Sequence, residues 1–254
     1  MIETLYGRNG VCESLRAGRR KPYKLLLAEG VRETDIVTQI ASLAKQAGVR
    51  VTRVRREDLD QLGDVHHQGV ALETSDYPYS SMDEIVALAR SRGEAPLILL
   101  LDLLKDPQNV GSLLRTAEAA GTHGVVIQHR RAVGVTPAVV HASAGAVEHL
   151  LVAQVTNLVD AIGRLKGRDV WVAGLEAARD AQLYTEADLT GALALVVGSE
   201  GEGLRRLVRE SCDFLVQLPM HGQVTSLNAS VAGSIVLYEV LRQREAKANK
   251  RVSE

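Results

Sequence analysis

The chain has 254 residues, of which 46% are hydrophobic but only 3% aromatic, and its formal net charge is −1. This length allows one large core or two smaller ones, and a core of Leu, Val, Ala and Ile favours an α/β protein. The two cysteines, Cys12 and Cys212, have no C-x-x-C spacing and the seven histidines have no metal-ligand spacing, so we expect no disulfide framework and no metal.

Membrane and export signals are missing from the sequence. No apolar run approaches the roughly 20 residues needed to span a bilayer. The N-terminal residues lack both the apolar core of a signal peptide and the Arg-rich character of a transit peptide. We therefore expect a cytoplasmic protein without membrane contact.

The first 76 residues alternate between helix-like and strand-like segments. Helical patterns cover residues 10–17, 34–47 and 57–62, and strand patterns cover residues 24–30, 49–54 and 69–73. This alternation predicts a small α/β domain over residues 1–76. Residues 77–95 contain a polar helix between turn formers, which we interpret as a linker with one helix that buries little.

Basic residues are concentrated in the N-terminal part. Residues 8–24 hold six basic side chains against Glu13 alone, and residues 50–56 add four arginines. Guanidinium groups bind phosphate bidentately and stack on bases, so this bias is compatible with RNA contact. Ordinary solvated charge is an equally good interpretation of both clusters.

From residue 96 onward the apolar runs become nearly continuous. They cover residues 97–102, 124–128, 150–155, 169–176, 192–198 and 214–219. Strands buried on both faces have this character. Helical patterns separate most of them, and the last of these helices runs from about residue 227 to 247. A mostly parallel sheet covered by helices is therefore expected over residues 96–254.

Ligands of open α/β sheets bind at the carboxyl ends of the strands, so polar clusters there are candidates for chemistry. The first cluster runs from Asp102 to Arg115. Asp106 before a proline is a good helix N-cap, which could be its whole role, and Arg115 could simply pair with Glu118. Asn109 stands in the first turn of the same helix.

The second cluster, residues 198–203, is rich in glycine, which permits tight turns and lets backbone approach a ligand closely. Glu200 in this loop could serve only the dipole of the following helix. The loop matches neither G-x-G-x-x-G nor the phosphate-binding loop, so triphosphate chemistry is poorly supported. The third cluster covers residues 218–228, where Ser226 is a plausible N-cap of the last helix.

Three ordered motifs, residues 106–121, 196–204 and 218–232, resemble those of the SpoU (TrmH-like) branch of the SPOUT RNA 2′-O-ribose methyltransferases. The SAGA stretch at residues 143–146 also looks like this family. Residues 7–20 and 66–73 resemble the substrate-binding domain attached to many members, although Gly10 stands where the family often has proline.

This resemblance implies a C-terminal SPOUT domain with a deep trefoil knot and a small N-terminal α/β/α domain that binds RNA. It also implies S-adenosylmethionine as cofactor, no metal, and a homodimer whose active site takes residues from both chains. The members that are most similar methylate a guanosine of large-subunit rRNA. A tRNA, another rRNA nucleotide of the antibiotic-resistance type, or a catalytically silent RNA-binding assembly factor are the alternatives.

The resemblance also assigns residues to the site. The polar active-site positions match Asn109, Arg115, Glu200, Ser226 and Asn228. The cofactor-binding positions match Gly198, Gly201, Leu218, Met220 and Leu227. Family members are often proposed to use the arginine as a base, but a guanidinium group normally stays protonated, so we prefer Arg115 as a group that positions phosphate and hydroxyl.

Overall fold

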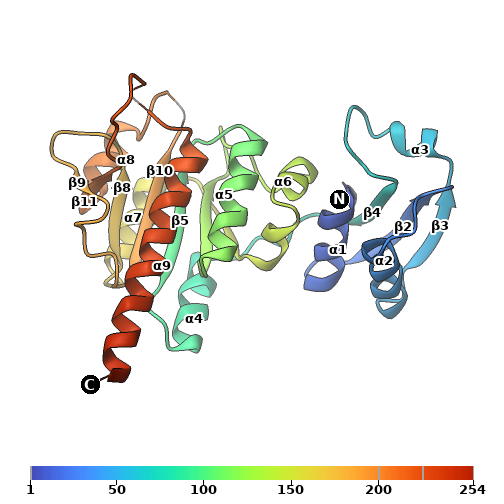
Figure 1. Ribbon diagram of the computed structural model, residues 1–254, viewed down its shortest axis with the longest axis horizontal. Helices are drawn as coiled ribbons and strands as arrows, with labels where there is room; N and C mark the ends of the chain where they lie inside the picture. Colours follow the sequence, from blue (N-terminus) through green and yellow to red (C-terminus); the bar gives the residue numbers. More distant parts are fainter. Residues whose placement is uncertain (1, 200, 225, 254) are drawn as a thin grey trace. The chain divides into compact units, whose positions relative to one another are not determined.

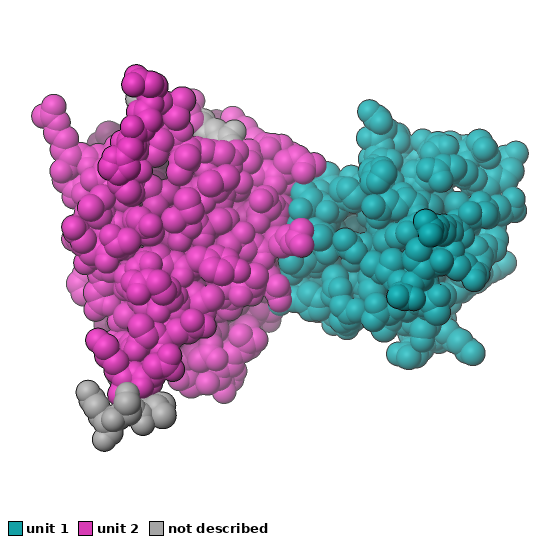
Figure 2. Space-filling model, in the orientation of Figure 1, with its two compact units in different colours: residues 1–78, 135–149 teal, residues 79–134, 150–254 magenta. Residues whose placement is uncertain are grey.

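The computed structural model describes residues 2–199, 201–224 and 226–253 of the chain. These residues form two compact units (Figure 2). Unit 1 contains residues 1–78 and 135–149, and unit 2 contains residues 79–134 and 150–254. The N-terminal unit is thus built from two separate stretches of the chain. The predicted domain boundaries near residues 76 and 96 stay predictions.

Unit 1 contains a four-stranded sheet in the order β1-β4-β2-β3. Its strands are β1 (Ile2–Tyr6), β2 (Pro22–Ala28), β3 (Arg50–Val54) and β4 (Val70–Ser75). Its N-terminal helices are α1 (Arg8–Ala17), α2 (Asp35–Gln46) and α3 (Arg56–Asp60). Strand β4 is antiparallel to β1 and β2, whereas β2 and β3 are parallel. The predicted α/β alternation is confirmed, and β1 is a strand that the sequence patterns did not predict.

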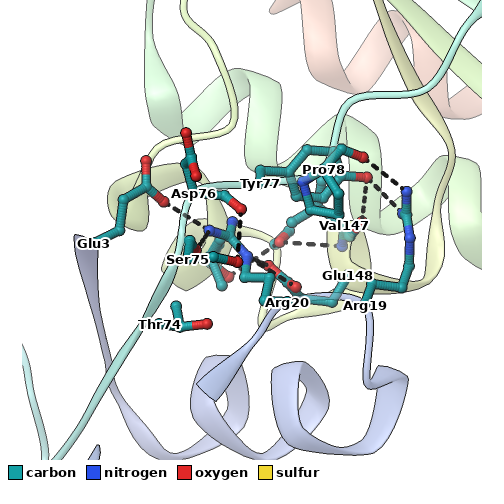
Figure 3. Close-up of polar contacts among 12 residues, drawn as sticks. Glu3, Arg19, Arg20, Thr74, Ser75, Asp76, Tyr77, Pro78, Val147 and Glu148 are labelled. Carbon is teal, nitrogen blue, oxygen red and sulfur yellow. Dashed lines mark hydrogen bonds and ion pairs between the residues drawn. The ribbon is translucent and has the colours of Figure 1, made fainter. Parts of the chain in front are cut away.

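Residues 135–149 complete unit 1 with α6 (Pro137–Ala142) and the 3₁₀ helix η1 (Ala146–His149). A buried ion pair holds this segment (Figure 3). Arg20 Nε donates to both carboxylate oxygens of Glu148, at 2.9 and 3.1 Å, and Arg20 Nη1 donates to Glu3 at 2.6 Å. Beside them, the hydroxyl of Tyr77 donates to the carbonyl of Val147 at 3.3 Å. Burial raises the pKa of Tyr77 to about 12.

Unit 2 is built on a seven-stranded sheet in the order β7-β6-β5-β10-β8-β11-β9. The strands are β5 (Leu97–Asp102), β6 (Gly124–Gln128), β7 (Val152–Val155), β8 (Trp171–Leu175), β9 (Gln182–Leu183), β10 (Leu193–Gly198) and β11 (Phe214–Gln217). Every neighbouring pair among them is parallel. All residues of the adjacent strands β5 and β10 are buried, as their continuous apolar runs predict.

Helices cover both faces of this sheet: α4 (Met82–Arg92), α5 (Pro107–Ala119), α7 (Leu158–Lys166), α8 (Arg206–Ser211) and α9 (Ala229–Ser253). Figure 1 shows α5 and α9 side by side over one face. Residues of α4, α7 and α8 share one hydrophobic cluster with Ile98 and Leu100 of β5. Ile98 and Leu100 are two positions apart, so their side chains point to the same face of β5. This face is the one opposite to α5 and α9.

The expectation that the helix after residue 77 buries little is wrong. Met82, Ile85, Val86 and Ala89 of α4 are all buried. Their spacing of three, four and seven residues forms one apolar stripe on the helix. Because polar residues lie between them, the composition of the segment alone does not indicate this stripe. Among the helices in the described part of the chain, none is long and apolar enough to cross a membrane.

Candidate active site

The three predicted polar clusters meet at the carboxyl edge of the unit 2 sheet. Gly198 at the end of β10 is paired in register with Asp102 at the end of β5. A cavity of about 530 Å³ opens beside them, lined by the ends of β8, β10 and β11 and by the start of α9. A second cavity of about 250 Å³ shares Ser199 and Glu202 with the first, so the two are neighbours.

Glycine is required where β10 ends. A Cβ atom on Gly198 would lie 2.3 Å from the backbone carbon and oxygen of Gly203, closer than any real contact. The chain folds back at this point, since Gly203 N donates to Ser199 O at 3.0 Å and Gly201 has a φ of 80°. Gly198 and Gly201 consequently present backbone to the larger cavity. Glu200 lies outside the described residues.

An ion pair ties this loop to β5. The side chain of Asp102 is fully buried and accepts two hydrogen bonds, from Arg205 Nε at 2.7 Å and from Arg205 N at 2.9 Å. The loop that follows Gly198 is thereby anchored at both ends. Asp102 was recognised as part of the first cluster, but Arg205 was not singled out, because nothing in its local sequence indicates a partner about a hundred positions away.

The third loop supplies apolar walls to the larger cavity. Leu218 and Met220 follow β11 and line the cavity, and Leu227 lines it from just before α9. Ser226 also lines it, and its side chain is exposed. All five residues predicted to bind the cofactor thus surround one cavity, although their roles stay predictions.

Asn228 joins the first and third clusters. Its Nδ2 donates to Asn109 Oδ1 at 2.7 Å. Its Oδ1 accepts from the backbone nitrogens of Ser230 and Val231 at 2.9 and 3.2 Å, which makes Asn228 the N-cap of α9. The prediction that Ser226 caps this helix is wrong, because α9 begins at residue 229. Asn109 lines the smaller cavity and Asn228 the larger one.

Helix α5 begins as predicted but leaves Arg115 apart from both cavities. Asp106 caps the helix by accepting from the backbone nitrogens of Gln108 and Asn109, both at 3.2 Å. Arg115 is exposed and forms no hydrogen bond or ion pair with the described residues, Glu118 included. Six positions separate it from Asn109, which places the two side chains about 120° apart around the helix.

Glu176 is a cavity residue that the sequence patterns did not reveal. It follows β8 directly and lines the larger cavity. Burial raises the pKa of its carboxyl group, and the nearby Arg209 opposes this effect. An acid directly after a buried strand was the available signal, but it was included in the apolar run. Among the described residues, no group of three or more His, Cys, Asp or Glu side chains could hold a metal ion.

Comparison with known proteins agrees with this architecture. The family model described as the SpoU rRNA Methylase family matches residues 96–238, and the model for RNA 2′-O ribose methyltransferase substrate binding matches residues 4–80. YacO of Bacillus subtilis, whose name places it in the TrmH family of tRNA/rRNA methyltransferases, is 47% identical over 238 residues, which are 94% of each chain. A Staphylococcus saprophyticus protein named for the same family is 42% identical and covers 94% of this chain and 95% of its own.

Solved structures show the same fold. The SpoU methyltransferase AviRb from Streptomyces viridochromogenes, in complex with the cofactor AdoMet (S-adenosylmethionine), is 25% identical with a TM-score of 0.80. The match covers 95% of this chain and 90% of AviRb. The trefoil knot stays a prediction. The chain therefore belongs to the SpoU rRNA methylase family and is an RNA 2′-O-ribose methyltransferase that uses S-adenosylmethionine.

Proposed function

We propose that this enzyme methylates the 2′-hydroxyl of a guanosine in large-subunit ribosomal RNA, in the cytoplasm. The observation that carries the proposal is the pair of neighbouring cavities joined by the hydrogen bond between Asn109 and Asn228. One cavity suits the cofactor and the other lies where a nucleotide would approach it. The motif resemblance favours the guanosine, and the names of the relatives leave tRNA open.

The larger cavity fits an adenosyl ligand. Its volume of about 530 Å³ lies in the usual range for small-molecule sites. Leu218, Met220 and Leu227 offer apolar surface for a purine, and the loop after Gly198 offers backbone groups. When bound, S-adenosylmethionine supplies a methyl group on a sulfonium that is already activated for displacement. The protein then mainly has to align the ribose hydroxyl with this methyl group and let the hydroxyl proton pass to solvent.

Asn109 and Asn228 are well placed for that positioning. Their mutual hydrogen bond of 2.7 Å fixes two amide groups at the boundary of the cavities. Ser226 and, by the family motif, Glu200 would order the same region. Arg115 stays charged at any physiological pH, so we assign it the binding of phosphate and hydroxyl oxygens rather than proton removal.

We further propose that the enzyme is a homodimer and that Arg115 serves the site of the partner. Val231, Ile235 and Tyr238 on α9 are 47%, 36% and 52% exposed. Their spacing of four and seven residues places these apolar side chains on one side of the helix, which suits packing against a second copy. Arg115 on the neighbouring helix α5 has no partner among the described residues of its own chain.

Mapping the methylated nucleotide tests the substrate. Transcripts of ribosomal and transfer RNA would be incubated with enzyme and labelled S-adenosylmethionine, and the modified position would be located by reverse transcription at low nucleotide concentration. A single 2′-O-methylguanosine in large-subunit rRNA is the expected result. Label confined to tRNA, or RNA binding without methyl transfer, would contradict the proposal.

Mixed dimers test the shared site. Arg115→Ala and Asn228→Ala variants are each expected to be inactive, because each lacks one part of every site. A dimer with one chain of each kind contains one intact site if Arg115 acts across the interface, so about half of the wild-type activity should return. No recovery in purified mixed dimers would show that Arg115 acts within its own chain.

A further inference from the structure

The loop after β8 brings a single acid, Glu176, into the cavity that we assign to the cofactor. Its backbone is fixed, because Glu176 N donates to Val216 O at 3.0 Å. The side chain is only 27% exposed. The oxygen Oε2 is buried and accepts no hydrogen bond from any described residue. A buried carboxylate oxygen without a donor is unusual in a native protein and calls for a partner.

Glu176 shares its nearest cation, Arg209, with a second acid, Asp180. Arg209 Nε lies 3.6 Å from Glu176 Oε2, which is an ion pair too long for a hydrogen bond. Arg209 Nη2 donates instead to both carboxylate oxygens of Asp180, at 2.7 and 2.9 Å. The carboxylate of Glu176 therefore has a cation nearby, but its Oε2 has no hydrogen-bond donor in the described part of the chain.

We infer that Glu176 accepts hydrogen bonds from the ribose hydroxyl groups of the adenosyl cofactor and so selects a ribonucleoside ligand. The inference rests on the proposed placement of the cofactor in this cavity. An ionised carboxylate is purely an acceptor, and its terminal torsion is soft, so a rotation about it turns Oε2 from its buried position toward hydroxyl donors in the cavity. Neutral hydroxyl donors complete its hydrogen bonding while Arg209 stays bonded to Asp180. The ammonium group of the methionine part is the competing donor for this carboxylate.

The other described acid of the cavity does not share these properties. Glu202 also lines it, but its side chain is exposed to solvent. An exposed carboxylate satisfies its oxygens with water and gains little from a ligand hydroxyl. Glu176 is therefore the described acid of this cavity with most to gain from cofactor binding.

Equilibrium binding, rather than turnover, tests the inference. The probes are S-adenosylhomocysteine, 5′-methylthioadenosine, which has no ammonium group, and the 2′-deoxy and 3′-deoxy forms of 5′-methylthioadenosine. Titration calorimetry with the full-length wild type should show roughly tenfold weaker binding when a hydroxyl contacted by Glu176 is removed, as expected for a hydrogen bond to a charged group. Glu176→Gln should bind 5′-methylthioadenosine about tenfold more weakly and discriminate little against the deoxy forms.

Glu202→Gln is the matched control, because it removes the charge of the other described acid that lines the cavity and leaves Glu176, Arg209 and Asp180 in place. It should bind every probe as the wild type does, and circular dichroism should show all variants folded. Binding of 5′-methylthioadenosine by Glu176→Gln within twofold of wild type would overturn the inference. So would a loss confined to S-adenosylhomocysteine, which would assign Glu176 to the ammonium group. Failure of the wild type to bind any probe would instead contradict the proposed cofactor cavity.

Discussion

Replacing Arg20 with methionine should loosen unit 1 around residues 135–149. The side chains of Arg20 and Glu148 are 1% and 0% exposed, so the variant leaves a buried carboxylate without its cation (Figure 3). Breaking a buried pair from one side typically costs about 3–5 kcal/mol, far more than the 0–1 kcal/mol of a surface pair. We expect the free energy of unfolding to fall by about 3 kcal/mol at pH 8, since Glu148 is completely buried.

The destabilisation caused by Arg20→Met should be smaller at acidic pH. Burial already raises the pKa of Glu148 in the folded protein, although Arg20 opposes this. A carboxyl group whose folded pKa is raised stabilises the fold below its unfolded pKa, and this contribution is lost as pH rises through the folded value. Removing Arg20 raises the folded pKa further. The variant should therefore be closer to the wild type at pH 5 than at pH 8.

Peptide-resolved hydrogen exchange is the suitable assay, because Trp171, the one tryptophan, lies in unit 2 and does not report on unit 1. Amides of residues 139–148 should exchange faster in Arg20→Met, with little change in β5 or β10. The double variant Arg20→Met with Glu148→Met should recover most of the protection, because it leaves no buried charge. Equal exchange in the wild type and the single variant, or a double variant as labile as the single one, would refute the reasoning.

Three further changes have defined outcomes. Gly198→Ala forces the backbone of the loop to move, since its Cβ would lie 2.3 Å from backbone atoms, and calorimetry should show at least about tenfold weaker binding of S-adenosylhomocysteine. Asp102→Asn should lower the unfolding free energy by only about 1–2 kcal/mol in urea titrations, because Arg205 is 43% exposed and partly solvated without its partner. Replacing both Arg50 and Arg53 with glutamine should weaken RNA binding and reduce the slope of log affinity against log salt by roughly 1.5, and an unchanged slope would exclude phosphate contact there.

Sequence patterns predicted most of unit 2 because its strands are buried on both faces. Continuous apolar runs located β5 and β10, and parallel strands necessarily end at the same edge, so clusters far apart in sequence could be expected to meet. The hydrogen bond between Asn109 and Asn228 is the clearest instance. The helix cap was misplaced because Ser226 and Asn228 are both good N-cap residues, and only the start of the helix distinguishes them.

Features that depend on distant partners could not be predicted in this way. Strand β1 is short and half-exposed, and it is defined by its antiparallel pairing with β4. Residues 135–149 belong to unit 1 through contacts with residues more than a hundred positions earlier, such as the pair of Arg20 with Glu148. No local periodicity encodes such a contact. The burial of α4 is a different case. Its apolar stripe is visible in the sequence, but the polar composition of the segment led to the prediction that the helix buries little.

Burial also divides the two basic clusters of unit 1 by role. The arginines of the first cluster bind protein groups: Arg16 pairs with Glu13, Arg19 donates to the Tyr77 hydroxyl at 2.8 Å, and Arg20 is buried with Glu148. All four arginines of residues 50–56 are exposed on β3 and at the start of α3, and among them Arg55 alone pairs with a described residue, Asp58 at 3.3 Å. Phosphate binding requires guanidinium groups that are accessible and not already engaged. The arginines of the first cluster therefore serve the structure of unit 1. The expectation of RNA contact rests on the second cluster.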